Sequence, residues 1–138
     1  MPEGMWIVPM ELNHVPDQFL DQAEINMGRG PAFTLFYNNE IIGIGGICDF
    51  WNGVGEGWIV PLVEFPRLKE LAKGIYIAVA EAIKFLIETY GYCRIQATVR
   101  TDIEINRKFL ENFGFICEGV LDKYFEDGQN AYIMALVV

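Results

Sequence analysis

The chain has 138 residues, the usual size of one domain, and 52% of them are hydrophobic, so it can bury a substantial core. Ten Lys and Arg against 19 Asp and Glu give a net charge of −9, which argues against a protein built to bind nucleic-acid phosphates. No apolar run reaches the roughly 18 residues that a membrane span requires. We therefore expect neither nucleic acid nor a membrane as a partner.

The three cysteines, Cys48, Cys93 and Cys117, are far apart and include no CxxC pair. This pattern predicts reduced, mostly buried thiols in a cytoplasmic protein. His14 is the lone histidine, so it cannot complete a zinc site with them, and we expect it at the surface.

Apolar periodicity and turn residues predict five elements in the first half of the chain. They are a strand over residues 5–10, a short helix over 15–25, and strands over 32–37, 41–50 and 57–63. Asn38 and Asn39 are a turn signal that joins two of these strands into a hairpin. Pro61 has no backbone N–H, so its strand must lie at a sheet edge or carry a bulge there.

A helix over residues 75–90 is the longest helical signal, with a wide apolar face and Gly91 as its C-terminal cap. The segment before it, residues 65–73, is weaker, and Pro66 could begin a short helical turn there. A strand over residues 94–99 follows the long helix at once. Such a crossover normally makes the two flanking strands parallel.

The remaining elements are a short helix and a closing hairpin. Thr101 and Glu104 have the spacing of a capping box that begins the helix. Strands over residues 115–124 and 131–138 follow, joined at Asp127-Gly128. The order predicts one mixed α/β (α+β) domain, residues 1–138, around a mostly antiparallel sheet.

Five segments carry a family likeness in type and spacing: Gly74-Ile75-Tyr76 before the long helix, residues 94–99, Phe113-Gly114-Phe115, Glu118-Gly119 and Asp127-Gly128. Together they resemble the GCN5-related N-acetyltransferase (GNAT) superfamily over residues 32–138. Trp58 in the third hairpin strand, with a Leu in place of the family's usual tyrosine, further resembles small phage- or prophage-encoded proteins of this fold.

The resemblance implies a sheet that splays open between its fourth and fifth strands, where acetyl-coenzyme A inserts. The backbone around Val60 and Leu62 would pair with the pantetheine arm and supply an oxyanion donor. The diphosphate would lie on free amides at the start of the long helix, where the helix dipole attracts an anion. The cofactor residues so implied are Val60, Leu62, Leu71, Ala72, Lys73, Gly74, Ile75 and Tyr76.

The phosphate loop departs from the family pattern, which has Arg or Gln, then Gly, then Gly or Ala. Leu71 and Tyr76 stand at the first and last of these places, and Gly74 alone is kept. Leu110 occupies the position of the tyrosine that usually protonates the leaving coenzyme A thiolate in the family, and Ile103 replaces a common asparagine. These departures predict weaker cofactor binding than is typical, or none.

Glu56 is the predicted general base, beside Trp58 at the start of its strand; the alternative is a solvated hairpin residue. Trp58 and Tyr124 are predicted to line the acceptor pocket, although core packing explains Trp58 equally well. Tyr124 or Tyr132 could replace the missing acid. Gly74 is either a phosphate-loop residue or a plain helix-start residue.

Two functions remain open from the sequence. The first is an acetyl-CoA-dependent N-acetyltransferase acting on a small-molecule or peptide amine, with which the acidic charge is compatible. The second is a non-catalytic binding or structural protein of the same fold, of phage or prophage origin and then associated with a virion. The resemblance also allows a homodimer formed through the C-terminal strands.

Overall fold

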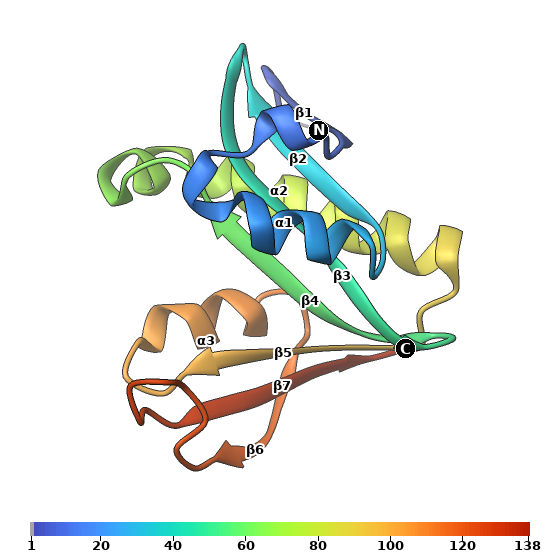
Figure 1. Ribbon diagram of the computed structural model, residues 1–138, viewed down its shortest axis with the longest axis vertical. Helices are drawn as coiled ribbons and strands as arrows, with labels where there is room; N and C mark the ends of the chain where they lie inside the picture. Colours follow the sequence, from blue (N-terminus) through green and yellow to red (C-terminus); the bar gives the residue numbers. More distant parts are fainter. Residues whose placement is uncertain (1) are drawn as a thin grey trace.

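The computed structural model describes residues 2–138, which form a seven-stranded sheet in the order β1-β2-β3-β4-β5-β7-β6 (Figure 1). The strands are β1 Met5–Pro9, β2 Ala32–Tyr37, β3 Glu40–Trp51, β4 Val54–Pro61, β5 Arg94–Arg100, β6 Ile116–Leu121 and β7 Ala131–Val137. The helices are α1 Leu20–Met27, α2 Phe65–Tyr90 and α3 Glu104–Glu111, with 3-10 turns η1 Leu12–His14 and η2 Asp17–Phe19 before α1. The predicted mixed, mostly antiparallel α/β fold is confirmed.

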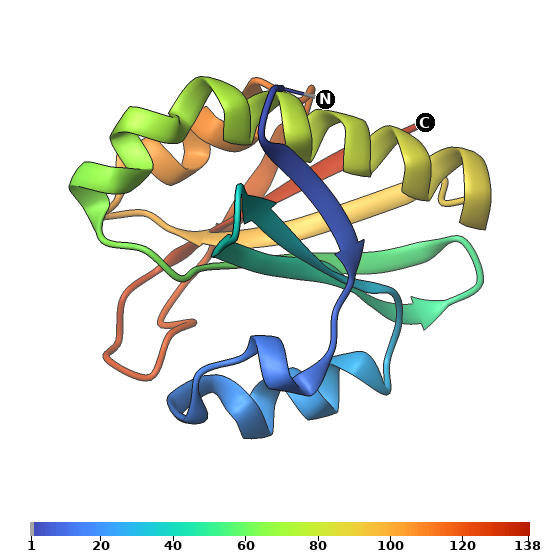
Figure 2. The same cartoon turned by 90° about the horizontal axis from the view of Figure 1, so that it is seen from above.

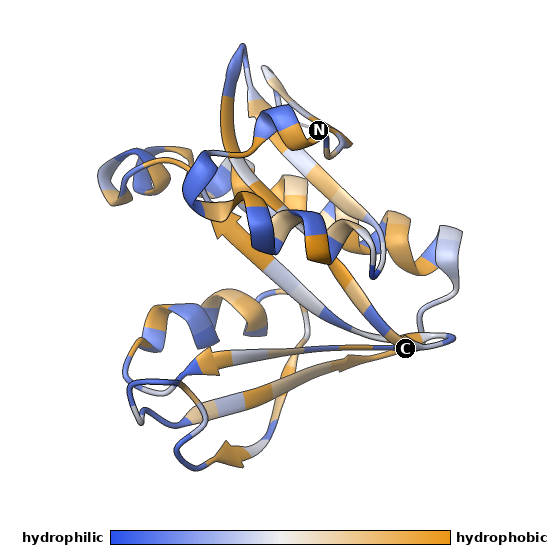
Figure 3. Cartoon of the chain, viewed as in Figure 1, coloured by the Kyte–Doolittle hydropathy of each residue, from blue (hydrophilic) through white to orange (hydrophobic). Residues whose placement is uncertain are grey.

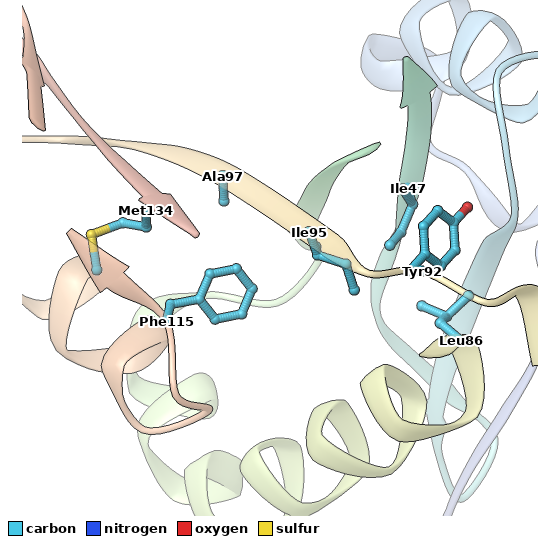
Figure 4. Close-up of a cluster of buried hydrophobic side chains, with 7 residues drawn as sticks. All are labelled: Ile47, Leu86, Tyr92, Ile95, Ala97, Phe115 and Met134. Atoms are coloured by element: carbon cyan, nitrogen blue, oxygen red, sulfur yellow. The ribbon is translucent and has the colours of Figure 1, made fainter. Parts of the chain in front are cut away.

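The layers follow from the apolar faces of the helices. α1 lies on one face of the sheet, and α2 and α3 lie on the other (Figure 2). Apolar residues concentrate along the strands and on the helix faces turned toward them (Figure 3). One of the buried clusters joins β3, α2, β5, β7 and the residue before β6, and Figure 4 shows Phe115 and Met134 at one end of it and Leu86 and Tyr92 at the other.

The strands β1, β2 and β3 lie within one residue of the predicted bounds, because each is a predominantly apolar run. Asn38 adopts φ +52° at the tip of the β2–β3 hairpin, a conformation that asparagine tolerates. The predicted helix over residues 15–25 is shorter: its first part forms η2, and α1 begins at Leu20.

β4 and β5 pair in parallel, as predicted, but over a short distance. Their register runs from Val54 opposite Arg94 to Glu56 opposite Gln96 and stops there. The remaining part of β4 pairs with β3 alone, up to Pro61 opposite Gly43. The missing N–H of Pro61 therefore costs no ladder hydrogen bond on the side of β5.

The long helix begins ten residues earlier than predicted. α2 runs unbroken from Phe65 to Tyr90, with a proline in its first turn. Proline is pre-organised for that position, and residues 67–73 are mostly strong helix formers, so nothing stops the helix before residue 75. Leu71 and Ile75 extend its apolar face onto β1 and β3.

The C-terminal elements differ from prediction at their ends. The N-cap of α3 is Ile103, with no side-chain hydrogen bond, so the predicted capping box at Thr101 does not form. β6 ends at Leu121 instead of residue 124, and residues 122–130 form a loop with Gly128 at φ +88°.

The expected exposure of His14 and the expected burial of two cysteines are wrong. His14 is not a surface residue: its side chain is 12% exposed, and its Nδ1 lies 2.8 Å from the Oγ1 of the buried Thr34, because η1 folds back over β2. Cys93 and Cys117 are exposed instead of buried, because one follows a helix end and the other lies on the edge strand β6.

Candidate functional site

The site is the gap that opens where β4 and β5 part. Glu56 and Gln96 form the last pair before the two strands diverge, so Glu56 lies at the vertex of the gap (Figure 1). Its carboxyl group is half-buried, and burial raises its pKa above the ordinary value. A carboxylate with a raised pKa is a better proton acceptor, which suits the role predicted for Glu56.

Beyond the vertex, every second side chain of β4 packs on the face of the sheet that α1 covers. Trp58, Val60 and Leu62 alternate with their neighbours and pack toward α1, against Met10 and Ile44 among others. The indole Nε1 of Trp58 is buried there without a hydrogen-bond partner. The packing interpretation of Trp58 thus accounts for most of its surface.

The free backbone groups of β4 are offset by one residue from the predicted ones. Leu62 donates its N–H to the carbonyl of Ile42 at 3.0 Å, so that amide is not available as an oxyanion donor. Strand N–H groups alternate in direction, which turns the amide of Val60 toward β3 as well. The amide of Ile59 faces the gap, where β4 has no second neighbour.

The expected phosphate loop is replaced by helix. The amides of residues 71–76 lie in the interior of α2, where each is used in an i to i−4 hydrogen bond, so they are not free to hold a diphosphate. The free amides of the first turn belong to Phe65 and Arg67, since Pro66 has none, and the N-cap residue is the acidic Glu64.

The side chains of residues 71–75 differ in exposure. Ala72 and Lys73 are exposed, whereas Leu71 and Ile75 pack against the core. Gly74 faces β1: a Cβ added there would lie 2.7 Å from the Cε of Met5. The structure thus gives Gly74 a packing role, the close approach of α2 to β1.

Tyr76 bridges the two helices on the same face of the sheet. Its ring stacks on Phe113 with centroids 4.9 Å apart and planes 15° from parallel, and its hydroxyl donates to the carbonyl of Asn112 at 3.1 Å. Because α2 follows β4 and α3 packs on β5 and β7, this contact crosses the gap on that face. The ring therefore narrows the corner that the sequence assigned to the diphosphate.

The predicted acids do not converge on Glu56 through any direct contact in residues 2–138. Tyr124 lies in the loop after β6 and packs edge-on against Phe125, 5.1 Å between centroids. Tyr132 is on β7 beneath the guanidinium of Arg107, 5.4 Å from its ring centroid. Leu110, at the position of the family's tyrosine, packs against the core.

Sequence reasoning missed an arginine that fixes the loop beside the gap. Arg100 pairs with Asp102 and with Asp127 at 2.7 Å, and its guanidinium lies 5.3 Å from the ring centroid of Phe125. These contacts tie residues 122–130 to the end of β5. No local pattern signals the pair with Asp127, because the two residues are 27 positions apart.

No group of three or more His, Cys, Asp or Glu side chains within residues 2–138 could hold a metal ion. None of the helices in that range is long and apolar enough to cross a membrane.

No protein-family model matches the sequence, and no curated protein matches it significantly. Solved structures do match it. A GNAT family acetyltransferase from Elizabethkingia anophelis with acetyl-CoA bound has TM-score 0.79 and 13% identity, covering 99% of this chain and 100% of that one. Ard1 from Thermoplasma volcanium has TM-score 0.80 and 15% identity over 98% of both chains. A chimera of the spermidine N-acetyltransferase SpeG from Vibrio cholerae and hSSAT has TM-score 0.77 and 13% identity, covering 98% and 96%. At such low identity these similarities establish the fold that the sequence predicted.

Proposed function

We propose that the chain is an N-acetyltransferase that takes an acetyl group from acetyl-CoA and transfers it to an amine. The observation that carries this proposal is the gap: β4 leaves β5 after three residue pairs and presents an unpaired backbone edge. The fold is shared with acetyltransferases, one of them with acetyl-CoA bound. An extended pantetheine arm can pair with such an edge as an added strand does.

Acetyl-CoA would supply a thioester, whose thiol leaving group has an ordinary pKa of about 8.5 and so tolerates weak acid assistance. The amide of Ile59, one residue before Val60, would donate to the developing oxyanion. Glu56, at the vertex, accepts the proton that the amine loses as its nitrogen bonds to the acyl carbon. The raised pKa of Glu56 favours this transfer.

The diphosphate would have few contacts in the proposed complex. The helix amides of residues 71–76 are used within α2, so contacts would come from exposed side chains such as Lys73. Tyr76 must also turn away from Phe113 to open the corner. We therefore propose an affinity for acetyl-CoA carried mainly by the pantetheine arm.

The acceptor is proposed to be a basic amine, small or peptide-borne. The net charge of −9 favours the approach of a cation over that of an anion. Trp58 and Tyr124 stay predicted pocket residues. Trp58 would contribute the edge of its ring, since most of it packs toward α1.

Calorimetry with acetyl-CoA tests the proposal directly. We expect micromolar binding, and release of free thiol when a panel of alkylamines is added. Glu56→Gln should lower the turnover and leave acetyl-CoA binding unchanged. The absence of binding up to millimolar acetyl-CoA, in both the native chain and Tyr76→Ala, would refute the proposal.

A second function has one observation in its favour. The contact of Tyr76 with Phe113 and Asn112, together with the unbroken helix, closes the cofactor corner as a non-catalytic binding or structural protein would. The resemblance to phage- and prophage-encoded proteins gives that function a setting. This second function would be favoured if neither the native chain nor Tyr76→Ala binds acetyl-CoA.

A further inference from the structure

A cavity lies at the end of the sheet opposite the gap. It is lined by Asp49, Trp51, Asn52, Gly53, Tyr90 and Tyr92, and its volume is about 340 Å³. These residues come from the β3–β4 hairpin, the last residue of α2 and the segment before β5, which meet where β4 and β5 converge (Figure 1). We call this cavity the hairpin pocket.

Three of its six lining residues are aromatic. Tyr92 is 5% exposed and anchored in the core beside Ile47 and Leu86, as Figure 4 shows, whereas Trp51 is 68% exposed. The rings of Tyr90 and Tyr92 lie 6.3 Å apart at 45°. The wall thus combines one buried ring, that of Tyr92, with two rings, those of Tyr90 and Trp51, that solvent can reach.

The hairpin pocket contains one carboxylate, that of Asp49, which has no ion-pair partner in the described residues. The Asp49 carboxylate accepts a hydrogen bond from the Tyr92 hydroxyl at 2.5 Å, and no cation of residues 2–138 forms an ion pair with it. Arg29 accepts the Asp49 N–H through its backbone carbonyl at 2.8 Å, without an ion pair to the carboxylate. The orientation of Asp49 is therefore set by a neutral partner, and its charge stays available.

The helix α2 adds to this negative charge. It has 26 residues and ends at Tyr90 without a basic residue in its last turn. The last carbonyls of a helix lack intrahelical donors and carry the negative end of its dipole. The negative end of the α2 dipole therefore lies at Tyr90, which lines the hairpin pocket.

The hairpin pocket is also held in shape. The carbonyl of Gly53 accepts hydrogen bonds from the amides of Cys93 at 2.8 Å and Arg94 at 3.1 Å, which fixes the hairpin turn to the start of β5. A site that is ordered before binding loses less entropy when it binds a ligand.

We propose that the hairpin pocket binds an organic ammonium ion. Aromatic faces attract weakly hydrated cations, and a carboxylate with helix-end carbonyls adds direct electrostatic attraction. A bare metal ion is not supported, since one carboxylate does not make a coordination site. The volume lies at the lower end of the range of about 300–1,000 Å³ typical of small-ligand sites, which suits a headgroup. The site does not depend on acetyl transfer.

The test compares choline with 3,3-dimethylbutan-1-ol, its neutral isostere, at constant ionic strength. Binding is followed by NMR shifts of the Trp51 indole and the Asn52 amide. We expect choline to bind at least tenfold more tightly than the alcohol. Trp51→Leu should weaken choline binding about fivefold, the loss of one cation–π contact, and Asp49→Asn about tenfold, the loss of its charge.

Trp6→Leu is the matched control, because Trp6 is also an exposed tryptophan, stacked on Phe36 far from the hairpin pocket. It should leave choline binding unchanged. Equal binding of choline and the alcohol, shifts confined to other residues, or an unchanged affinity in Trp51→Leu would each overturn the proposal. Trp51 is largely exposed, so that variant keeps the test valid even if Asp49→Asn disturbs Tyr92.

Discussion

Replacing Tyr76 with alanine tests whether its ring closes the cofactor corner. The variant removes the stack on Phe113 and the hydrogen bond to Asn112 together. Alanine is also the best helix former, so α2 itself is not weakened by the change. We expect a less stable protein that binds acetyl-CoA more tightly.

The magnitudes follow from the two contacts. An aromatic pair contributes about 0.5–1.5 kcal/mol and a hydrogen bond about 0.5–1.5 kcal/mol. Tyr76 is 38% exposed, so the lower half of each range applies, and alanine restores up to about 0.5 kcal/mol of helix propensity. The free energy of unfolding should fall by about 1 kcal/mol. Because binding no longer has to break the bridge, the affinity for acetyl-CoA should rise five- to tenfold.

Urea unfolding and calorimetry measure the two effects on the same protein. Tyr76→Phe is the control, since it keeps the stack and loses only the hydrogen bond, and it should show about half of the loss in stability. An alanine variant that is as stable as the native chain, or less stable with unchanged affinity, would show that the bridge does not close the corner.

Two further changes probe the vertex and the close packing of the sheet. Glu56→Gln should raise the free energy of unfolding at pH 7, because burial raises the pKa of Glu56 and so penalises its ionised form. This gain should vanish as the pH falls below about 4.5, where the carboxyl group is protonated in both the folded and the unfolded chain. Unfolding measured as a function of pH can follow the change. Gly46→Ala should cost more than about 2 kcal/mol, since its Cβ would lie 2.2 Å from the carbonyl oxygen of Pro31, whereas Gly57→Ala meets only ordinary contacts at 3.5 Å or more. Thermal unfolding of the pair compares them, and equal melting temperatures would contradict the packing argument.

The sequence by itself determined the strands and the order of the elements. The apolar run over residues 32–37 and the Asn38-Asn39 turn are local signals, and so is the Gly91 cap, which adopts φ +73° at the end of α2. Each of these features depends only on residues within one turn or one strand, so tertiary packing does not alter it. The parallel pairing of β4 with β5 also followed from the chain, because a helical crossover leaves few alternatives.

Only the tertiary structure decided what surrounds the site. The start of α2 at Phe65 depends on the packing of Leu71 and Ile75 against β1 and β3, which no local signal reports. The bridge from Tyr76 to Phe113 joins side chains far apart in the sequence. The gap and the hairpin pocket likewise exist because distant strands converge at one end of the sheet and part at the other. Long-range contacts of this kind depend on the geometry of the assembled sheet, which the residues encode only collectively.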